Sequence, residues 1–458
     1  MKIQRNKELK MFRRDFLKYI SVAGASLLLP KMAFGAVDTP YTGPLWVFVH
    51  AAGGWDPTSL CDPKGYEEVL NNQNELVMEA NPMNKSFKTA DIATSASGSN
   101  IKFAPLMESE NDIANNRYAF RTFFDKYGKD LLVINGIDTQ TNGHSSGTRY
   151  TWSGRLSEGY PSFSALLAGI QLPASPMSFI TSGGYDFTDG VVAGTRLGNI
   201  RAIERISYVN RYSYNSKTNV ETAFHDKATY DRILQARDER YSQLYNRQSL
   251  RSVKTLMQKY KQAHSGSNEL KKLIEYLPDD INSHPDRNNR VFAQGRFAMA
   301  GYKAGLTVSV NITTGGFDTH GNHDNSHIPR LSELLKGLDL LQQEASNQGI
   351  ADRVVFVVGS DFGRTPRYNN GNGKDHWPIT SMMMMGAGIR GNRVIGASSF
   401  EHDALKVNPA TLASDTNGIN ITPAHIHKAL RKLAGIDNEQ LITQYYPIGG
   451  VEDLPIFT

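Results

Sequence analysis

Five short runs of apolar residues, separated by polar and amphipathic segments, form the predicted framework of this chain. They are "LWVFVH" (45–50), "LLVING" (131–136), "LTVSVNI" (306–312), "RVVFVVG" (353–359) and "SMMMMGA" (381–387). Nearly continuous apolar runs of this length are typical of buried strands, and especially of parallel strands covered on both faces. The pattern therefore predicts a mostly parallel central sheet.

Amphipathic patterns between and after these runs predict helices. In residues 329–349, five leucines recur at helical spacing on one face, and the segment begins with proline and ends with glycine. Residues 290–305 and 422–435 also fit helices. Strands alternating with helices predict an α/β fold in which helices flank the sheet.

Residues of about 155–285 have a different character. They contain a long polar, Tyr- and Arg-rich segment at 230–264 that fits a helix. We interpret this region as a helical insertion or cap on the α/β core. Its mixed charge is typical of a solvated helix face.

The charge of the chain is unevenly distributed. The formal net charge is +5, but residues 1–35 hold eight Lys or Arg and two acidic residues, which leaves 42 basic and 43 acidic residues in the remainder. A nearly neutral remainder gives no electrostatic reason to expect a nucleic-acid partner. A charged fraction of 21% and a hydrophobic fraction of 40% are ordinary for a globular protein.

The first 35 residues fit an export signal of the twin-arginine type. "RRDFLK" (13–18) precedes a short apolar run, and "AFGA" (33–36) follows it as a cleavage site after Gly35. We expect the twin-arginine export machinery as a partner and a periplasmic or secreted mature chain, 36–458. The alternative is an amphipathic N-terminal helix that stays attached. No later run reaches about 18 apolar residues, so we expect no transmembrane anchor.

Four of the predicted strands run into loops rich in residues that carry chemistry. Because ligands bind outside the carboxyl ends of the strands in an open parallel sheet, we expect these loops to converge. They contribute His50 and Asp56 after the first strand; Asp138, His144, Ser145, Ser146 and Thr148 after the second; Asp318, His320 and His323 after the third; and Asp361, Arg364, Arg367, Asp375 and His376 after the fourth.

The loop "GGFDTHGNHDNSH" (315–327) is the strongest candidate for metal binding. Asp318, with His320 or His323, would project into the cleft after a turn at two glycines. A carboxylate with imidazoles suits zinc, manganese or iron better than calcium, which prefers oxygen ligands alone. The alternative is that these side chains cap helices or make hydrogen bonds within the loop, with His327 as a neighbour of a helix cap.

Four motifs give the chain a resemblance to a known family. "GGFDTHGNH", "GSDFGRTPR", "GKDHWP" and "GAGIRGNRVIGAS" follow one another in the order and spacing of exported bacterial proteins catalogued as domain of unknown function 1501. The resemblance covers nearly the whole mature chain and is most specific over 315–398. That family is grouped with the alkaline phosphatase-like superfamily of phosphatases, sulfatases and cofactor-independent phosphoglycerate mutases, which implies an alkaline phosphatase-like α/β fold.

The resemblance also implies one or two divalent metals, held by Asp and His at strand ends. Asp56 stands in the place of the first acid, Asp318 with His320 or His323 in the place of the next pair, and Asp361 in the place of the last acid. A nucleophilic hydroxyl would come from Ser145, Ser146 or Thr148, beside His144.

One departure from the superfamily pattern affects the ligand set. Phe362 stands where the superfamily commonly has histidine directly after the last acid. His376 is the expected substitute, oriented by Asp375 as a hydrogen-bond partner. The superfamily's final histidine has no clear match, and His402 is a weak candidate for it.

These inferences together predict an exported metal-dependent hydrolase of phosphate or sulfate esters. Ser145 or Ser146 would attack the ester, and the planar Arg364 guanidinium would bind its anion, with Arg149 and Arg367 as substitutes. The alternative for Arg364 is a structural ion pair, for instance with Asp361.

Two other functions remain open. The first is a non-catalytic periplasmic or surface protein for binding or assembly, with a degenerate site and a protein partner on the insertion. The second is a mutase acting on phosphorylated metabolites, which the expected location outside the cytoplasm disfavours.

Overall fold

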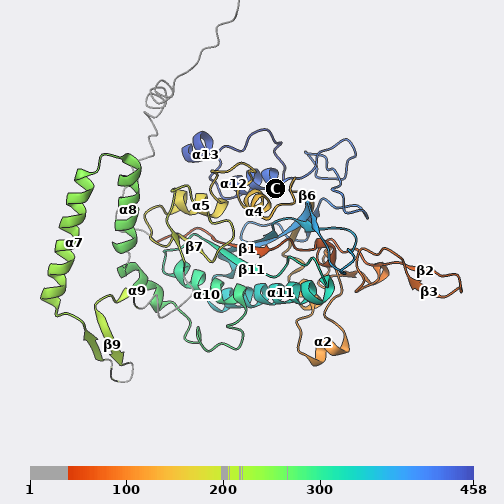
Figure 1. The fold of residues 1–458 in the computed structure, drawn as a ribbon, viewed down its shortest axis with the longest axis horizontal. Coiled ribbons are helices and arrows are strands. Elements are labelled where there is room, and N and C mark those ends of the chain that lie inside the picture. The colour runs from red at the N-terminus through yellow and green to blue at the C-terminus, as the bar shows by residue number, and fades with distance from the viewer. Residues whose placement is uncertain (1–39, 197–204, 206, 216–217, 219, 266) are drawn as a thin grey trace, which may run out of the picture.

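A single eight-stranded sheet forms the centre of the computed structural model, which describes residues 40–458 except 197–204, 206, 216–217, 219 and 266 (Figure 1). The predicted leader lies outside the described residues. In sheet order, the strands are β16 (Arg393–Ile395), β6 (Leu132–Asp138), β15 (Ile379–Gly386), β12 (Val354–Ser360), β1 (Leu45–Ala52), β11 (Ser309–Gly315), β7 (Phe179–Thr181) and β8 (Gly194–Thr195).

The sheet is mostly parallel, as predicted. β1 is parallel to β11 and β12, and the β11–β7, β7–β8 and β16–β6 pairs are also parallel. The methionine-rich β15 is the exception, because it is antiparallel to both β12 and β6. An apolar run indicates that a strand is buried on both faces, but it does not indicate the direction of the strand. The sequence therefore could not predict that β15 is antiparallel to its neighbours. Two reversals leave β6 running in the same direction as β12, and the carboxyl ends of β1, β6, β11 and β12 therefore meet at one edge.

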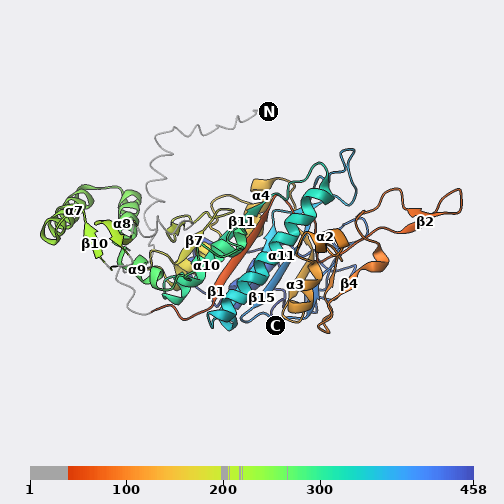
Figure 2. The ribbon, with the colours of Figure 1, turned by 90° about the horizontal axis from the view of Figure 1, so that it is seen from below.

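Helices cover both faces of the sheet (Figures 1 and 2). One face packs against α3 (Phe120–Tyr127), α10 (Arg290–Lys303) and α11 (His323–Asn347). The other packs against α4 (His144–Ser153), α5 (Phe163–Gln171) and α12 (Pro423–Leu433). The alternation along β1 separates the two cores, since Leu45, Val47 and Val49 join the first and Trp46 and Phe48 the second.

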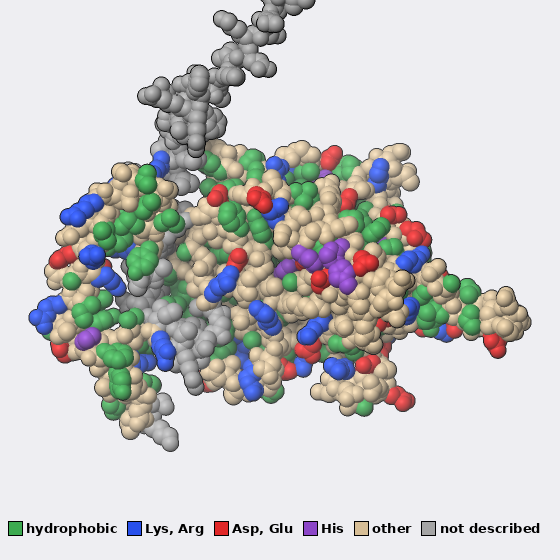
Figure 3. All heavy atoms as spheres, in the orientation of Figure 1, with side chains coloured by type: hydrophobic (Ala, Val, Ile, Leu, Met, Phe, Trp, Pro, Cys, Tyr) green, Lys and Arg blue, Asp and Glu red, His purple; other side chains and the backbone are tan. Residues whose placement is uncertain are grey.

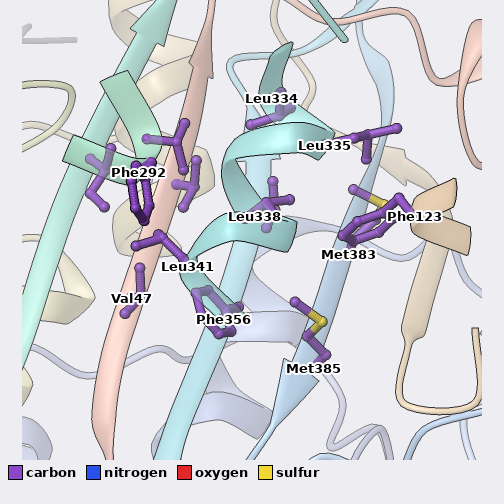
Figure 4. Packing of buried hydrophobic residues seen from close by; sticks show 14 of the residues in the cluster. Val47, Phe123, Phe292, Leu334, Leu335, Leu338, Leu341, Phe356, Met383 and Met385 are labelled. Carbon is purple, nitrogen blue, oxygen red and sulfur yellow. The ribbon is translucent and has the colours of Figure 1, made fainter. Parts of the chain in front are cut away.

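The first core shows how the predicted leucine stripe is used. Leu338 and Leu341 of α11 point toward the sheet, where they meet Val47, Phe356 and Met385 (Figure 4). Burying side chains of this size contributes about 1.5–3 kcal/mol each. The predicted helices at 290–305 and 422–435 are confirmed as α10 and α12.

The predicted start of α11 at Pro329 was wrong, because the helix begins six residues earlier, at His323. Asn322 precedes it in the left-handed conformation, with φ of 47°. A proline inside a helix costs one backbone hydrogen bond, and here the buried stripe that continues on both sides of it offsets that loss. His323 and His327 consequently lie one turn apart on a helix rather than in a loop.

Two groups of secondary-structure elements lie at opposite ends of the sheet domain (Figures 1 and 2). At one end are β9 (Arg211–Asn215), β10 (Val220–Ala223), α7 (Lys227–Arg247), α8 (Arg251–Ser265) and α9 (Ser267–Glu275). At the other is the hairpin of β2 (Glu68–Leu70) and β3 (Leu76–Met78). Within the region of about 155–285, α5, β7 and β8 belong to the sheet domain, β9 to α8 project from it, and α9 packs against α10 through Leu270 and Leu273, which are buried in the first core.

The remaining elements are short. They are β4 (Ala93–Thr94), β5 (Lys102–Phe103), α2 (Glu110–Ala114), β13 (Gly363–Arg364), β14 (His376–Trp377), α13 (Gln440–Tyr445) and three 3₁₀ turns at Pro57–Ser59, Thr89–Asp91 and Ala351–Arg353. Among the described residues, no helix has both the length and the apolar character needed to cross a membrane.

Candidate functional site

A cluster of histidine and acidic side chains lies at the edge where the carboxyl ends of β6, β11 and β12 meet, and it reaches the surface (Figure 3). β6 leads to His144, the first residue of α4, and β11 leads to Asp318 and His320. The antiparallel pair β13–β14 brings His376 to the same place. The convergence predicted from strand order is therefore present in the structure.

Asp318 is at the centre of this cluster. Its Oδ1 lies 3.0 Å from Nε2 of His320 and 3.1 Å from Nε2 of His376, and its Oδ2 lies 3.4 Å from Nε2 of His144. The Nε2 atoms of His320 and His376 are 3.0 Å apart. The Asp318 and His320 side chains are 46% and 48% exposed, so the cluster is open to solvent on one side.

Each of the three imidazoles is fixed through its other nitrogen. Nδ1 of His320 lies 2.7 Å from the Asp375 carboxylate, and Nδ1 of His376 lies 2.8 Å from the Asn142 carbonyl oxygen. Nδ1 of His144 lies 2.6 Å from the Asp361 carboxylate. Since carbonyls and carboxylates only accept, each Nδ1 donates to its oxygen partner, and each Nε2 is directed toward Asp318.

This arrangement fits a divalent metal. The Nε2 atoms of His144 and His376 and the Asp318 carboxylate can serve as ligands to one cation, and His320 adjoins them, with its Nε2 3.0 Å from that of His376. Tetrahedral bonds of about 2.0–2.1 Å place ligand atoms about 3.3 Å apart, close to the separations around Asp318. Ligand atoms of His144, Asp318 and His376 all lie within 4.8 Å of one another.

Asp361 lies behind His144 rather than in the open cluster. Its carboxylate accepts hydrogen bonds from His144, from the Gly53 amide at 3.2 Å and from Nε2 of His50 at 3.1 Å. Trp152 donates to Nδ1 of His50, which makes Nε2 the protonated nitrogen. Burial raises the pKa of Asp361, but the hydrogen bonds from His50 and His144 outweigh it and lower this pKa to about 2.

Arg364, predicted to bind a substrate anion, is fully buried. Its guanidinium donates to the carbonyl oxygens of Gly53, Gly54 and Lys374 and, at 2.8 Å, to Asp318. The ion pair left open as an alternative is thus made with Asp318 rather than with Asp361. Partial burial raises the pKa of Asp318, but hydrogen bonds from Arg364 and His376 lower it to about 2.

The two substitute arginines also have partners. Arg149 donates to the Leu156 carbonyl and contacts Glu158, and Arg367 contacts Glu401 at 3.0 Å. Of these three arginines, Arg364 is the one that contacts the open cluster, through its hydrogen bond to Asp318.

Asp56 and His323, two predicted metal ligands, lie in a separate buried cluster. Nζ of Lys374 is 2.6 Å and Nε2 of His323 is 3.2 Å from Oδ2 of Asp56, and Nε2 of His327 accepts from the Asp56 amide. Burial raises the pKa of Asp56, and Lys374 and His323 hold it well below its ordinary value. Burial also lowers the pKa values of His323 and His327. Sequence reasoning missed Lys374, although it directly precedes Asp375 and His376.

The predicted nucleophiles lie at the start of α4. Ser145 is exposed, next to His144. The Ser146 hydroxyl lies 2.6 Å from that of Thr141 and 3.0 Å from the Gly143 carbonyl oxygen. Phe362, in the position that departs from the superfamily pattern, is buried beside His144 and His376, with ring centroids 5.0 Å and 4.6 Å away.

His402, the weak candidate ligand, is also buried and lies outside the open cluster. Its Nδ1 donates to the Arg364 carbonyl oxygen, and its Nε2 has no partner among the described residues.

Comparisons with known proteins place this geometry in context. The family model described as "Protein of unknown function (DUF1501)" matches residues 190–449, which is more than half of the chain. A search of the curated proteins found no relative.

Solved structures give weak matches. They include the lipoteichoic acid synthase LtaP from Listeria monocytogenes (9% identity, 96% of this chain and 80% of that chain, TM-score 0.35). The alkaline phosphatase from the Antarctic bacterium TAB5 (9%, 86% and 99%, 0.34) and the PsFucS1 sulfatase from Pseudoalteromonas sp. (10%, 88% and 70%, 0.35) also match. The α/β class follows from the strand order and pairing of this chain itself.

Proposed function

Since the chain belongs to the DUF1501 family of proteins of unknown function, we propose its function from its own site: a divalent-metal-dependent hydrolase of phosphate or sulfate esters. The metal would be zinc, manganese or iron, and its ligands would be Asp318, His144, His320 and His376. The family resemblance seen in the motifs supports the class of substrate, and the geometry around Asp318 supports the metal.

One observation carries the proposal. Three imidazoles are held through Nδ1 by oxygen acceptors, and all three present Nε2 to a single carboxylate that is open to solvent. Oxygen partners at the second nitrogen are the usual support of metal-binding histidines. A divalent metal at this place lowers the pKa of a bound water and stabilises negative charge on an ester oxygen.

The protein's own residues supply orientation. Arg364 fixes the Asp318 carboxylate, Asp361 fixes His144, and the buried Phe362 ring closes one side of the cluster to water. Ser145, exposed beside His144, is the candidate nucleophile, and a metal-bound water is the alternative. The enclosed Arg364 would act on the substrate only through Asp318.

Metal content measured by elemental mass spectrometry tests the site. We expect one or two equivalents in the mature chain, 36–458, purified without a histidine tag or chelator, and less than about a tenth of that in Asp318→Ala and His376→Ala. Both variants should stay folded by circular dichroism and lose hydrolysis of p-nitrophenyl phosphate or sulfate. His225→Ala, a change of an exposed histidine in the projecting end, is the matched control. Unchanged metal content in both site variants would contradict the proposed metal site.

A second candidate function is a non-catalytic binding or assembly protein. It is favoured by the enclosure of Arg364 and by the hydrogen bonds that hold the Ser146 hydroxyl. The same measurements of metal content and ester hydrolysis distinguish the two functions. Full metal content without turnover of any phosphate or sulfate ester would favour the binding protein.

We also propose export through the twin-arginine machinery to the periplasm or beyond. The support is the sequence "RRDFLK" and the cleavage site that follows it. Replacing Arg13 and Arg14 by lysine should leave the full-length precursor in the cytoplasmic fraction. A processed, exported double variant would contradict the assignment.

A further inference from the structure

The exposed apolar side chains of this protein are concentrated at its two ends. Of 21 large apolar side chains exposed in the described residues, eleven lie within 205–276 and five within 67–79. We call these segments the lobe and the hairpin. They lie at opposite ends of the long axis in both ribbon views (Figures 1 and 2). Scattered exposed apolar residues need no explanation, but concentrated ones indicate contact surfaces.

The hairpin is apolar and acidic. All six residues of β2 and β3 are exposed, and Leu70 and Leu76, which pair across the strands, are 62% and 64% exposed. Residues 67–79 contain four glutamates and no lysine or arginine. An isolated two-stranded hairpin is only marginally stable in water, and its outer edges can pair with another chain. The hairpin therefore has the properties of a surface that binds another chain.

The lobe is apolar and basic. Residues 205–276 contain 14 Lys or Arg and seven acidic residues, and α8 has four basic residues and no acidic one. A groove of about 910 Å³ opens beside β9, and its lining combines basic with apolar side chains, among them Arg205, Arg211, Tyr212 and Phe224. Tyr212 is 68% exposed. Blue and green side chains lie side by side over this end of the molecule (Figure 3).

We propose that the hairpin of one copy docks on the lobe of a second copy, so that the chains associate head to tail. The two surfaces match in both respects, since each offers apolar side chains and their charges are opposite. The two surfaces of one molecule lie at opposite ends, so the contact must be intermolecular. A contact between two different patches is heterologous, and it builds rings if the rotation closes and filaments if it does not.

This assembly goes beyond the proposed hydrolase function and is independent of it. Neither segment contains a residue of the cluster around Asp318. An anionic membrane would suit the basic lobe but not the acidic hairpin, whereas a second copy of the chain satisfies both.

Sedimentation velocity of the mature chain tests the proposal. The mean mass should rise with protein concentration and fall when NaCl is raised from about 0.05 M to about 0.5 M, because salt screens the attraction. Leu70→Glu/Leu76→Glu in the hairpin and Tyr212→Glu in the lobe should each weaken association about tenfold or more. Phe400→Glu, a matched change at a position 66% exposed outside both segments, should have no effect.

Mixing the two defective variants separates head-to-tail contact from a symmetric one. The hairpin variant keeps its lobe and the lobe variant keeps its hairpin, so an equimolar mixture should form heterodimers that grow no further. A mixture that remains monomeric would overturn the head-to-tail assignment, as would association that the Phe400→Glu control also loses. A wild-type chain that is monomeric at all concentrations but sediments with phosphatidylglycerol vesicles would overturn the second copy as the occupant.

Discussion

The Arg364 guanidinium connects the backbone of two segments, the loop after β1 and the segment before β14, to the carboxylate at the centre of the cluster. Three of its four hydrogen bonds go to carbonyl oxygens and one to Asp318, and the side chain is fully buried. A planar fork with five donors suits this task, and an ammonium group does not. The residue therefore positions Asp318 and holds the loop after β1 in place.

Arg364→Lys should lower the free energy of unfolding by about 3 kcal/mol, because at least two buried carbonyls lose their donors. Urea denaturation measures this loss. Arg367→Lys, at an exposed pair with Glu401, should change it by less than about 1 kcal/mol. Wild-type stability in Arg364→Lys combined with lost activity would instead support direct contact with the substrate.

His402 should make stability depend on pH. Burial lowers its pKa to about 4, so between about pH 6.5 and pH 4 the unfolded chain binds a proton that the folded chain does not. The free energy of unfolding therefore rises with pH across this window, by about 1.4 kcal/mol per pH unit near its middle.

His402→Asn should remove this slope while keeping a donor for the Arg364 carbonyl and a residue that tolerates the φ of 58°. Urea denaturation at several pH values measures the difference between the two chains. An unchanged slope in the variant would assign the proton uptake to another group, such as the buried His427.

Residue types and strand-end positions were enough to predict that Asp318 and His376 would meet, but they left His320 and His323 as alternatives for the second imidazole, and the structure brings His320 to Asp318. They could not show that Asp361 supports His144 while Asp318 lies at the centre of the cluster. That difference depends on how deeply each carboxylate is buried in the folded loops. The burial of Arg364 was also beyond the sequence, since its acceptors are backbone carbonyls whose directions are fixed only by the folded loops.

The loops that surround the site are joined by a second, fully buried ion pair. Lys374 and Asp56 connect the loop after β1 with the segment before β14, and His323 of α11 completes the contact. A buried charge without its partner is strongly unfavourable, whereas a neutral pair of similar shape is tolerated. This link therefore fixes how α11 and the two loops sit on the sheet.

Lys374→Met should cost about 3–5 kcal/mol of unfolding free energy, because it leaves the Asp56 carboxylate buried and uncompensated. Asp56→Asn/Lys374→Met should recover a large part of this loss. A double-mutant cycle with Asp56→Asn measures the coupling. Additive single effects would mean that the pair contributes no link between the loops.

At the scale of elements, hydrophobic periodicity predicted the five main strands and the helices α10 and α12. It could not predict the direction of β15 or the start of α11. Both depend on tertiary partners: β15 on the two strands that accept it, and the first turn of α11 on the buried contacts of His323 and His327.

The proposed ligands come from widely separated parts of the chain. His144 belongs to α4, Asp318 and His320 follow β11, and His376 is 58 residues beyond Asp318. Such a set does not exist in the unfolded chain, so a metal that binds it stabilises the folded state as a whole. The metal centre would then be a structural link across the sheet edge as well as a reactive one.

Zinc at 100 times its dissociation constant should raise the free energy of unfolding by about 2.7 kcal/mol and the melting temperature by several degrees. Differential scanning calorimetry of the chelator-treated mature chain, with and without zinc, measures this rise independently of any ester substrate. The double variant His320→Ala/His376→Ala should lose the rise, and His225→Ala should keep it. An equal rise in the double variant and in the wild type would place the zinc elsewhere, because the loss of two ligands cannot leave the affinity unchanged.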